Sequence, residues 1–424
     1  MQRRRFLSLT AAGATTTAMA STLTSCGTGG SDTVTLSLVA ADYGDSAANT
    51  SQRYWDELAQ AFEVRHRGIK VDVKVYSWTE VDRKVAEMVH RGEAPDLAQI
   101  GAYADYANAG RLYRADEVLS ISAQAAFIPS IQRAGEVHRA LYGLPFVSSA
   151  RLLFYNKKLF DAAGIDGPPS DWDELKQAAA KLKAHGVKYP YALPLGREEA
   201  PAETMLWMLS GGGGYADTNG TYVIDSAQNI KTFEWLRDEL VGAGLTGPGT
   251  PGRTNRQQVF DAFARGEVGM LNGHPTLMKQ AAQGGVEYGT AALPGIDGKS
   301  KSTMGVADWM MAFRQNGKRE EIGTFLDFVY RDDNVLDFTS QYDLLPVTST
   351  VSESMREDSE YKRLWKFLDQ LEFAEFYPAS KPSWAAVSKD IKEKIGAVVA
   401  PGGDPAGVLG EIQRHADELD VANR

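Results

Sequence analysis

Apolar and polar residues follow two different periods along the first quarter of the chain. Apolar residues alternate with polar ones over 34–40 and 69–75, which predicts half-buried strands, and 95–100 predicts a short third strand. The segments between them, 52–67 and 80–91, carry apolar residues at helical spacing. This β-α-β-α-β order predicts a parallel sheet whose strands are joined by crossover helices.

Ligands of parallel α/β sheets bind beyond the carboxyl ends of the strands. In this chain those ends are followed by Asp42-Tyr43-Gly44, by Ser77-Trp78 and by Gly101-Ala102-Tyr103. We therefore expect these three loops to face a ligand.

The stretch 141–175 organises the middle of the chain. Residues 146–155 predict one long extended run whose centre, Ser148-Ser149-Ala150-Arg151, is polar between two apolar ends. Such a strand suits a chain that leaves one core, crosses a solvated gap and enters a second core. Further on, Asp171 and Glu174 have the spacing of a capping box, which predicts a helix that begins after Asp171.

Helical patterns continue through the carboxyl-terminal half of the chain. They predict helices over 226–241, 255–264, 357–370 and 384–398. The polar segment 197–202 is predicted to be a loop.

Several short motifs occur in a characteristic order: Tyr142-Gly143-Leu144-Pro145, Tyr155-Asn156-Lys157-Lys158-Leu159-Phe160, Ala163-Gly164, Pro168-Pro169, Trp172-Asp173-Glu174-Leu175 and Phe263-Ala264-Arg265-Gly266-Glu267-Val268-Gly269-Met270. Together they resemble the extracellular solute-binding proteins (family 1) of ABC importers, in the sugar-binding group that includes maltose-binding protein. The resemblance implies an α/β, two-lobe periplasmic-binding-protein fold (type 2). Its lobes are discontinuous, each has a central, mostly parallel sheet flanked by helices, and the ligand cleft lies between them.

In that fold the chain crosses between the lobes several times. We expect crossings near 148–151, near 293–313 and near 319–331, with Ser148 and Ser149 as hinge residues. The N-terminal lobe is then 33–148 with 290–330, and the C-terminal lobe is 149–289 with 331–424.

Composition places the chain among soluble globular proteins. Of its 424 residues, 43% are hydrophobic and 24% charged, and the length allows two or more domains. The net charge of -10 disfavours nucleic acid as a partner.

The first 26 residues have the features of an export signal with a lipobox. Arg3-Arg4-Arg5-Phe6-Leu7 matches the twin-arginine pattern but also fits an ordinary basic start, so both export routes stay open. Cys26 is the only cysteine and follows small residues, which predicts lipidation there and excludes a disulfide within the chain. Residues 27–32 are predicted to form a flexible tether. We expect a protein anchored by its lipid on the outer face of the cell membrane, on the periplasmic side if an outer membrane exists.

Motifs of the common enzyme classes do not occur. There is no G-x-S-x-G, and the six histidines show no metal-binding spacing. The adjacent Glu198 and Glu199 are interpreted as a solvated charge pair. We expect no catalysis, no metal and no cofactor.

Sugar recognition requires aromatic rings that stack on apolar sugar faces and polar groups that bind hydroxyls. The candidates that combine such side chains with loop positions near strand ends are Tyr43, Trp78, Tyr103, Arg151, Glu203, Asn272, Asp308, Trp309 and Trp384. Trp384 also matches the position of a stacking tryptophan in the resembled family. Structural roles remain open for several of them: Trp309 as a core residue, Asn272 as a turn former and Arg151 as a bridge between lobes.

The favoured hypothesis is a substrate-binding lipoprotein of an ABC carbohydrate importer. It captures a mono- or oligosaccharide between its lobes as a monomer and delivers it to membrane permease subunits. Two alternatives stay open: a binding protein for a non-sugar solute such as a peptide or a polyamine, and a secreted glycoside-active enzyme.

Overall fold

The computed structural model describes residues 33–44, 49–78, 80–298 and 303–422. The predicted export signal, the lipidation site Cys26 and the tether lie outside the described residues. Within the described part, no helix has the length and apolar character that a membrane span needs.

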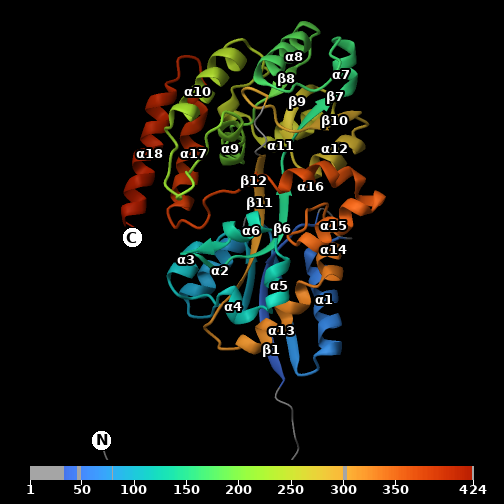
Figure 1. The fold of residues 1–424 in the computed structure, drawn as a ribbon, viewed down its shortest axis with the longest axis vertical. Helices are drawn as coiled ribbons and strands as arrows, with labels where there is room; N and C mark the ends of the chain where they lie inside the picture. Colours follow the sequence, from blue (N-terminus) through green and yellow to red (C-terminus); the bar gives the residue numbers. More distant parts are fainter. Residues whose placement is uncertain (1–32, 45–48, 79, 299–302, 423–424) are drawn as a thin grey trace, which may run out of the picture.

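Two sheets form the centres of two lobes, one above the other in Figure 1. In the first lobe β1 (Val34–Ala41), β2 (Ile69–Tyr76) and β3 (Leu97–Ile100) are parallel, as the alternating pattern predicts. The strand β11 (Thr303–Ala312) lies antiparallel to β3, and the short strand β12 (Ala374–Glu375) pairs with β11, which gives the order β12-β11-β3-β1-β2. The carboxyl ends of β1, β2 and β3 therefore meet at one edge of this sheet.

Helices surround the first sheet, and a short hairpin of β4 (Glu136–Val137) and β5 (Ala140–Leu141) lies beside them. The helices are α1 (Ser51–Arg65), α2 (Val81–His90), α3 (Ala104–Asn108), α4 (Ala115–Val118), α5 (Ile121–Ala126), α6 (Pro129–Ala134), α13 (Arg319–Val329), α14 (Asp332–Gln341), α15 (Ser349–Glu357) and α16 (Trp365–Leu371).

The second lobe has a four-stranded sheet with the order β10-β7-β9-β8. These strands are β7 (Leu152–Asn156), β8 (Tyr189–Ala192), β9 (Val268–Gly273) and β10 (Tyr288–Ala291). The helices around them are α7 (Lys157–Ala162), α8 (Trp172–Ala184), α9 (Ala200–Ser210), α10 (Ala227–Trp235), α11 (Arg256–Ala264), α12 (Thr276–Gln283), α17 (Trp384–Val398) and α18 (Pro405–Ala422).

The chain passes from the first sheet to the second at Arg151. The strand β6 (Leu144–Ala150) pairs with β11 in the first sheet, whereas β7 pairs with β9 and β10 in the second. The apolar–polar–apolar pattern of 146–155 thus marks a real crossing between two cores. The predicted hinge residue Ser148 is buried, and its hydroxyl donates to the carbonyls of Leu345 and Pro346 at 3.2 and 3.0 Å.

The chain returns to the first sheet between β10 and β11, and it leaves again after α16 through β12 (Ala374–Glu375), which pairs with β11. Before that point, Phe338 of α14 packs on Phe146 with ring centroids 4.7 Å apart. Helices α14 to α16 therefore lie with the first lobe, although the predicted boundaries assign 331–424 to the second lobe. The other lobe boundaries stay a prediction.

Local details differ from expectation in three places. The predicted loop 197–202 already contains the start of α9 at Ala200. The helix expected over 357–370 is divided into the end of α15, a 3-10 turn (Ser359–Leu364) and α16. The helix expected over 226–241 is α10 continued by a π-helical segment (Leu236–Val241).

Candidate functional site

A cavity of about 370 Å³ lies between the lobes, and we call it the cleft cavity. The first lobe lines it with the loop after β3, including Gly101 and Tyr103, and with parts of α2 and α3. The second lobe lines it with the segment that leads into α17, including Lys381 and Trp384. The volume is in the range of small-molecule sites. The position is the one that the strand-end argument predicts for a ligand.

A second cavity of about 390 Å³ lies against the same connecting segment and shares Lys381 with the cleft cavity. Its lining includes Arg133 of the first lobe and Tyr215 and Tyr377 of the second. The interlobe space is therefore hollow along both sides of the segment between β12 and α17.

Three aromatic rings with mutually tilted planes pack together beside these cavities, and we call them the aromatic cluster. The ring centroid of Trp384 lies 5.0 Å from that of Tyr377 and 5.1 Å from that of Tyr215. Trp384 is half-buried and lines the cleft cavity, whereas the two tyrosines line the second cavity. Packing on the tyrosines holds the indole in place, so that its free surface can stack on an apolar ligand face.

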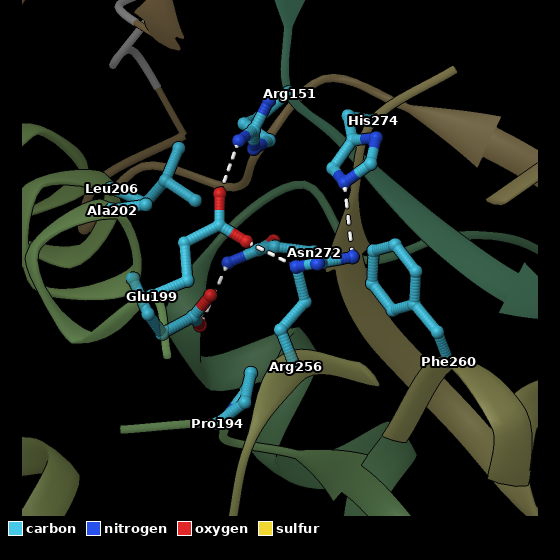
Figure 2. A pocket seen from close by; sticks show the side chains of 10 residues that line it. Arg151, Pro194, Glu199, Ala202, Leu206, Arg256, Phe260, Asn272 and His274 are labelled. Atoms are coloured by element: carbon cyan, nitrogen blue, oxygen red, sulfur yellow. Dashed lines mark hydrogen bonds and ion pairs between the residues drawn. The ribbon is translucent and has the colours of Figure 1, made fainter. Parts of the chain in front are cut away.

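A small polar pocket of the second lobe, about 10 Å³ in volume, is shown in Figure 2. Arg151, at the lobe crossing, donates from Nη2 to Oε1 of Glu199 at 2.5 Å. Arg256, at the start of α11, lies with Nε 2.5 Å from Oε2 of Glu199 and with Nη2 2.6 Å from Oε1 of Glu198. His274, which follows β9, lies with Nε2 3.4 Å from Nη1 of Arg256. Four separate segments thus meet in one network of charges.

Burial and the positive charges of Arg151 and Arg256 lower the pKa of His274 well below its usual value, so its imidazole is neutral near pH 7. Tyr377 belongs to the aromatic cluster and lies near this pocket. Burial raises the pKa of Tyr377 above its usual range, and the charges of Glu199 and Arg151 act on the same phenol. The polar pocket therefore adjoins the interlobe space.

Glu203, one turn into α9, lies on the inner wall of the polar pocket. Its Oε1 accepts hydrogen bonds from Trp207 Nε1 at 2.9 Å, Asn272 Nδ2 at 3.1 Å and the Tyr191 hydroxyl at 3.3 Å. Burial raises the pKa of Glu203 to about 8, against the lowering effect of these donors. The carboxyl group is therefore mostly protonated at neutral pH and is able to donate a hydrogen bond.

The first lobe contributes a second polar group at the carboxyl end of β1. The Tyr43 hydroxyl donates to Asp308 Oδ2 at 2.8 Å and accepts from Gln99 Nε2 at 2.7 Å. Trp78 packs edge-on against Tyr43 with centroids 5.3 Å apart and is 37% exposed. Burial raises the pKa of Asp308 to about 6, and the charge of Asp82 also raises it. The structure therefore brings Tyr43, Trp78 and Asp308 together.

Tyr103 and Trp309 lie deeper than a ligand-stacking role requires. Tyr103 is fully buried and donates from its hydroxyl to the carbonyl of Ala134, although its ring lines the cleft cavity. Trp309 is 3% exposed, packs edge-on against Tyr103 at 5.1 Å and lines neither interlobe cavity. The candidates Arg151, Glu203 and Asn272 meet in the polar pocket, and Trp384 lies at the cleft cavity.

Sequence reasoning missed several members of the site. Glu198 and Glu199 are not a solvated pair, because each is held by an arginine from a distant segment. Arg256 and Tyr377 were not selected as candidates. The sequence around an arginine at a helix start or a tyrosine in a loop does not indicate which distant residues it will contact. His274 directly follows the strand β9 (Val268–Gly273).

Comparisons with known proteins agree with this architecture. The family model described as bacterial extracellular solute-binding protein matches residues 47–335. A binding protein of Brucella abortus (strain 2308) is 29% identical over 373 residues, which cover 86% of this chain and 89% of that protein. The sn-glycerol-3-phosphate-binding periplasmic protein UgpB of Salmonella typhimurium (strain LT2) is 26% identical over 258 residues, 57% of each chain. The solved cyclic α-maltosyl-1,6-maltose binding protein of Arthrobacter globiformis has a TM-score of 0.77 at 17% identity and covers 91% of this chain and 99% of its own.

Proposed function

The chain belongs to the bacterial extracellular solute-binding proteins, and from this premise we propose that it captures a carbohydrate between its lobes for an ABC importer. The observation that carries the proposal is the cleft cavity, where Trp384 supplies an aromatic face and loops of both lobes form the walls. Rings for apolar sugar faces and polar groups for hydroxyls are the combination that saccharide binding requires. A relative in structure, from Arthrobacter globiformis, is named for a cyclic maltosyl-maltose, which supports the same class of ligand.

The mechanism we infer is capture by lobe closure. The saccharide touches both lobes, so it binds the closed arrangement more tightly and shifts the population toward it. Rotation takes place at the crossings, with Ser148 and Ser149 of β6 close to the axis. The closed protein then docks on the permease subunits of the importer.

The roles of the individual residues follow from their places. Trp384 and Trp78 stack on sugar faces, while Tyr43, Asp308, Arg151, Glu203 and Asn272 orient or bind hydroxyls. Tyr103 and Trp309 support the cleft wall from behind. The ligand leaves unchanged, because capture involves no covalent step. The exported protein acts as a monomer held at the membrane by lipid on Cys26.

A thermal-shift screen of the purified protein tests this proposal. Neutral mono-, di- and oligosaccharides are compared with peptides and polyamines, because binding to the native state raises the melting temperature. We expect a shift with one class of saccharide that is lost in Trp384→Ala. Phe373→Ala serves as the control, since Phe373 is 52% exposed and lines neither interlobe cavity. A shift with peptides or polyamines and none with any saccharide would overturn the substrate class.

A further inference from the structure

The arginines of the polar pocket are fully matched by carboxylates. Arg151 is 6% exposed and is paired with Glu199, and Arg256 is paired with both Glu198 and Glu199. His274 adds no charge near neutral pH. Two positive and two negative charges therefore lie in and beside this pocket, so the ion-paired network has no net charge to offer an ionic ligand.

The opposite wall of the interlobe space carries charges of both signs. Asp105 lines the cleft cavity together with His90 and Arg111. Asp82 lies close to this wall, because a backbone hydrogen bond from Gly101 reaches its carboxylate. Asp308 lies close enough to Asp82 for its pKa to be raised by that charge. An anion that enters between the lobes therefore meets these carboxylates as well as Arg111 on this wall. Both arginines of the polar pocket are already paired with carboxylates.

We propose that Glu198 and Glu199 are specificity-determining residues that reserve the site for uncharged saccharides and exclude phosphate esters. The inference rests on the proposed use of the interlobe cleft, and it names the charge of the ligand within that function. Family membership alone does not decide the charge of the ligand, because the relative in Salmonella typhimurium is named for a phosphate ester, sn-glycerol 3-phosphate.

The physical reason lies in the geometry of the ion pairs. A phosphate dianion can bind the paired edge of either arginine only by displacing a carboxylate that lies 2.5 to 2.6 Å away. At the remaining N–H groups the carboxylates cancel the positive charge that would attract the dianion. The displaced Glu199 would then be a half-buried carboxylate without its partner, beside a second negative group. A site that would leave one charge unpaired with the wrong ligand discriminates against that ligand. An uncharged saccharide leaves all three ion pairs intact and needs only hydrogen bonds.

The same ion pairs also orient the arginines toward an uncharged ligand. Guanidinium nitrogens held in place by carboxylates keep further N–H groups free to donate to hydroxyl oxygens. Arg151 uses Nη1 for the Ser149 hydroxyl at 3.2 Å, at the lobe crossing itself. The network therefore also connects the hinge with the ligand pocket.

The test measures binding of charged and uncharged probes to the purified protein and three variants by titration calorimetry. The probes are sn-glycerol 3-phosphate, glucose 6-phosphate, inorganic phosphate and a neutral saccharide series. Glu199→Gln and Glu198→Gln each give the pocket one net positive charge. Glu267→Gln is the matched control, since Glu267 pairs with Lys188 and Arg265 outside the pocket and is as exposed as Glu198. Melting temperatures without ligand show whether each variant is folded.

The wild-type protein should bind none of the phosphate probes. At least one of Glu199→Gln and Glu198→Gln should bind a phosphate ester at least about tenfold more tightly than the weakest affinity that the titration detects, because close charge pairs at binding sites have effects of this size. This gain should shrink as salt is added, which a merely structural role would not produce. The control should behave as wild type.

Binding of a phosphate ester by the wild-type protein would overturn the inference even if saccharides also bind. Folded variants without any gain for phosphate esters would overturn it as well. A failure of the proposed function has a different signature, namely no response of the wild-type protein to any saccharide. The gain of phosphate binding in the variants can be measured whether or not the wild-type protein responds to a saccharide.

Discussion

Replacing Glu203 by glutamine should remove one defined part of the pH dependence of stability. Glu203 is 5% exposed, and its Oε1 accepts three hydrogen bonds that a glutamine carbonyl oxygen can also accept. The substitution therefore keeps the shape and the acceptor but abolishes the titration.

The size of the effect follows from the pKa of Glu203, which burial raises from 4.5 to about 8. Between these two values the unfolded chain has lost the proton while the folded protein still holds it. The folded state thus binds more protons, so the free energy of unfolding falls as pH rises. The slope is roughly 1.4 kcal/mol per pH unit, from pH 4.5 upward until the folded carboxyl ionises near pH 8. The stabilisation is complete below pH 4.5 and is lost above pH 8.

Denaturant unfolding at half-unit steps from pH 5 to pH 8.5, followed by tryptophan fluorescence, measures this slope. Trp207 donates directly to Glu203, so the signal reports the surroundings of the carboxyl. The difference between wild type and Glu203→Gln isolates this residue from other titrating groups, and the variant should become the more stable form at high pH. Curves that stay parallel between pH 5 and pH 8 would refute the raised pKa and with it the neutral carboxyl in the site.

Three further substitutions test the scaffold. Asp96→Ala removes a fully buried carboxylate that pairs with Lys318 at 3.0 Å, and it should lower the free energy of unfolding by about 3 kcal/mol; a loss under about 1 kcal/mol would contradict this role. Asp171→Ala removes the cap of α8 and should cost about 1 kcal/mol by denaturant unfolding, with no change expected in ligand affinity. Gly143→Ala places a methyl group 2.9 Å from the Tyr103 ring, so it should destabilise by about 1–3 kcal/mol and weaken ligand binding; unchanged calorimetric affinity would show that the cleft wall tolerates the shift.

Features that depend on neighbours in sequence were predictable. The cap at Asp171 is present, since Asp171 accepts from the Glu174 amide at 2.8 Å. The reciprocal bond of a capping box is shifted by one residue, because a carboxylate oxygen of Glu174 accepts from the Ser170 amide at 2.8 Å. The crossing at Arg151 was visible because a strand shared by two cores needs apolar ends and a polar middle. Strand order β-α-β-α-β predicted the parallel part of the first sheet for the same local reasons.

Features that depend on distant partners were not predictable. The pairing of Glu199 with Arg151 joins residues 48 positions apart, and Glu198 and Arg256 are 58 apart, so adjacency in sequence misled the interpretation of the two glutamates. The lobe to which α14 to α16 belong was not predicted, because their apolar faces could pack in either lobe. The contact of Phe338 with Phe146 places them with the first lobe. Tertiary contacts of this kind leave no periodic trace in a single sequence.

The central claim, capture of an uncharged saccharide between two lobes, is tested most directly by small-angle X-ray scattering of the protein titrated with the saccharide that stabilises it. The account predicts a radius of gyration that falls as ligand is added and saturates at the concentration where the thermal shift saturates. Binding that saturates with no change in the radius of gyration would place the ligand on one lobe alone and would contradict the account.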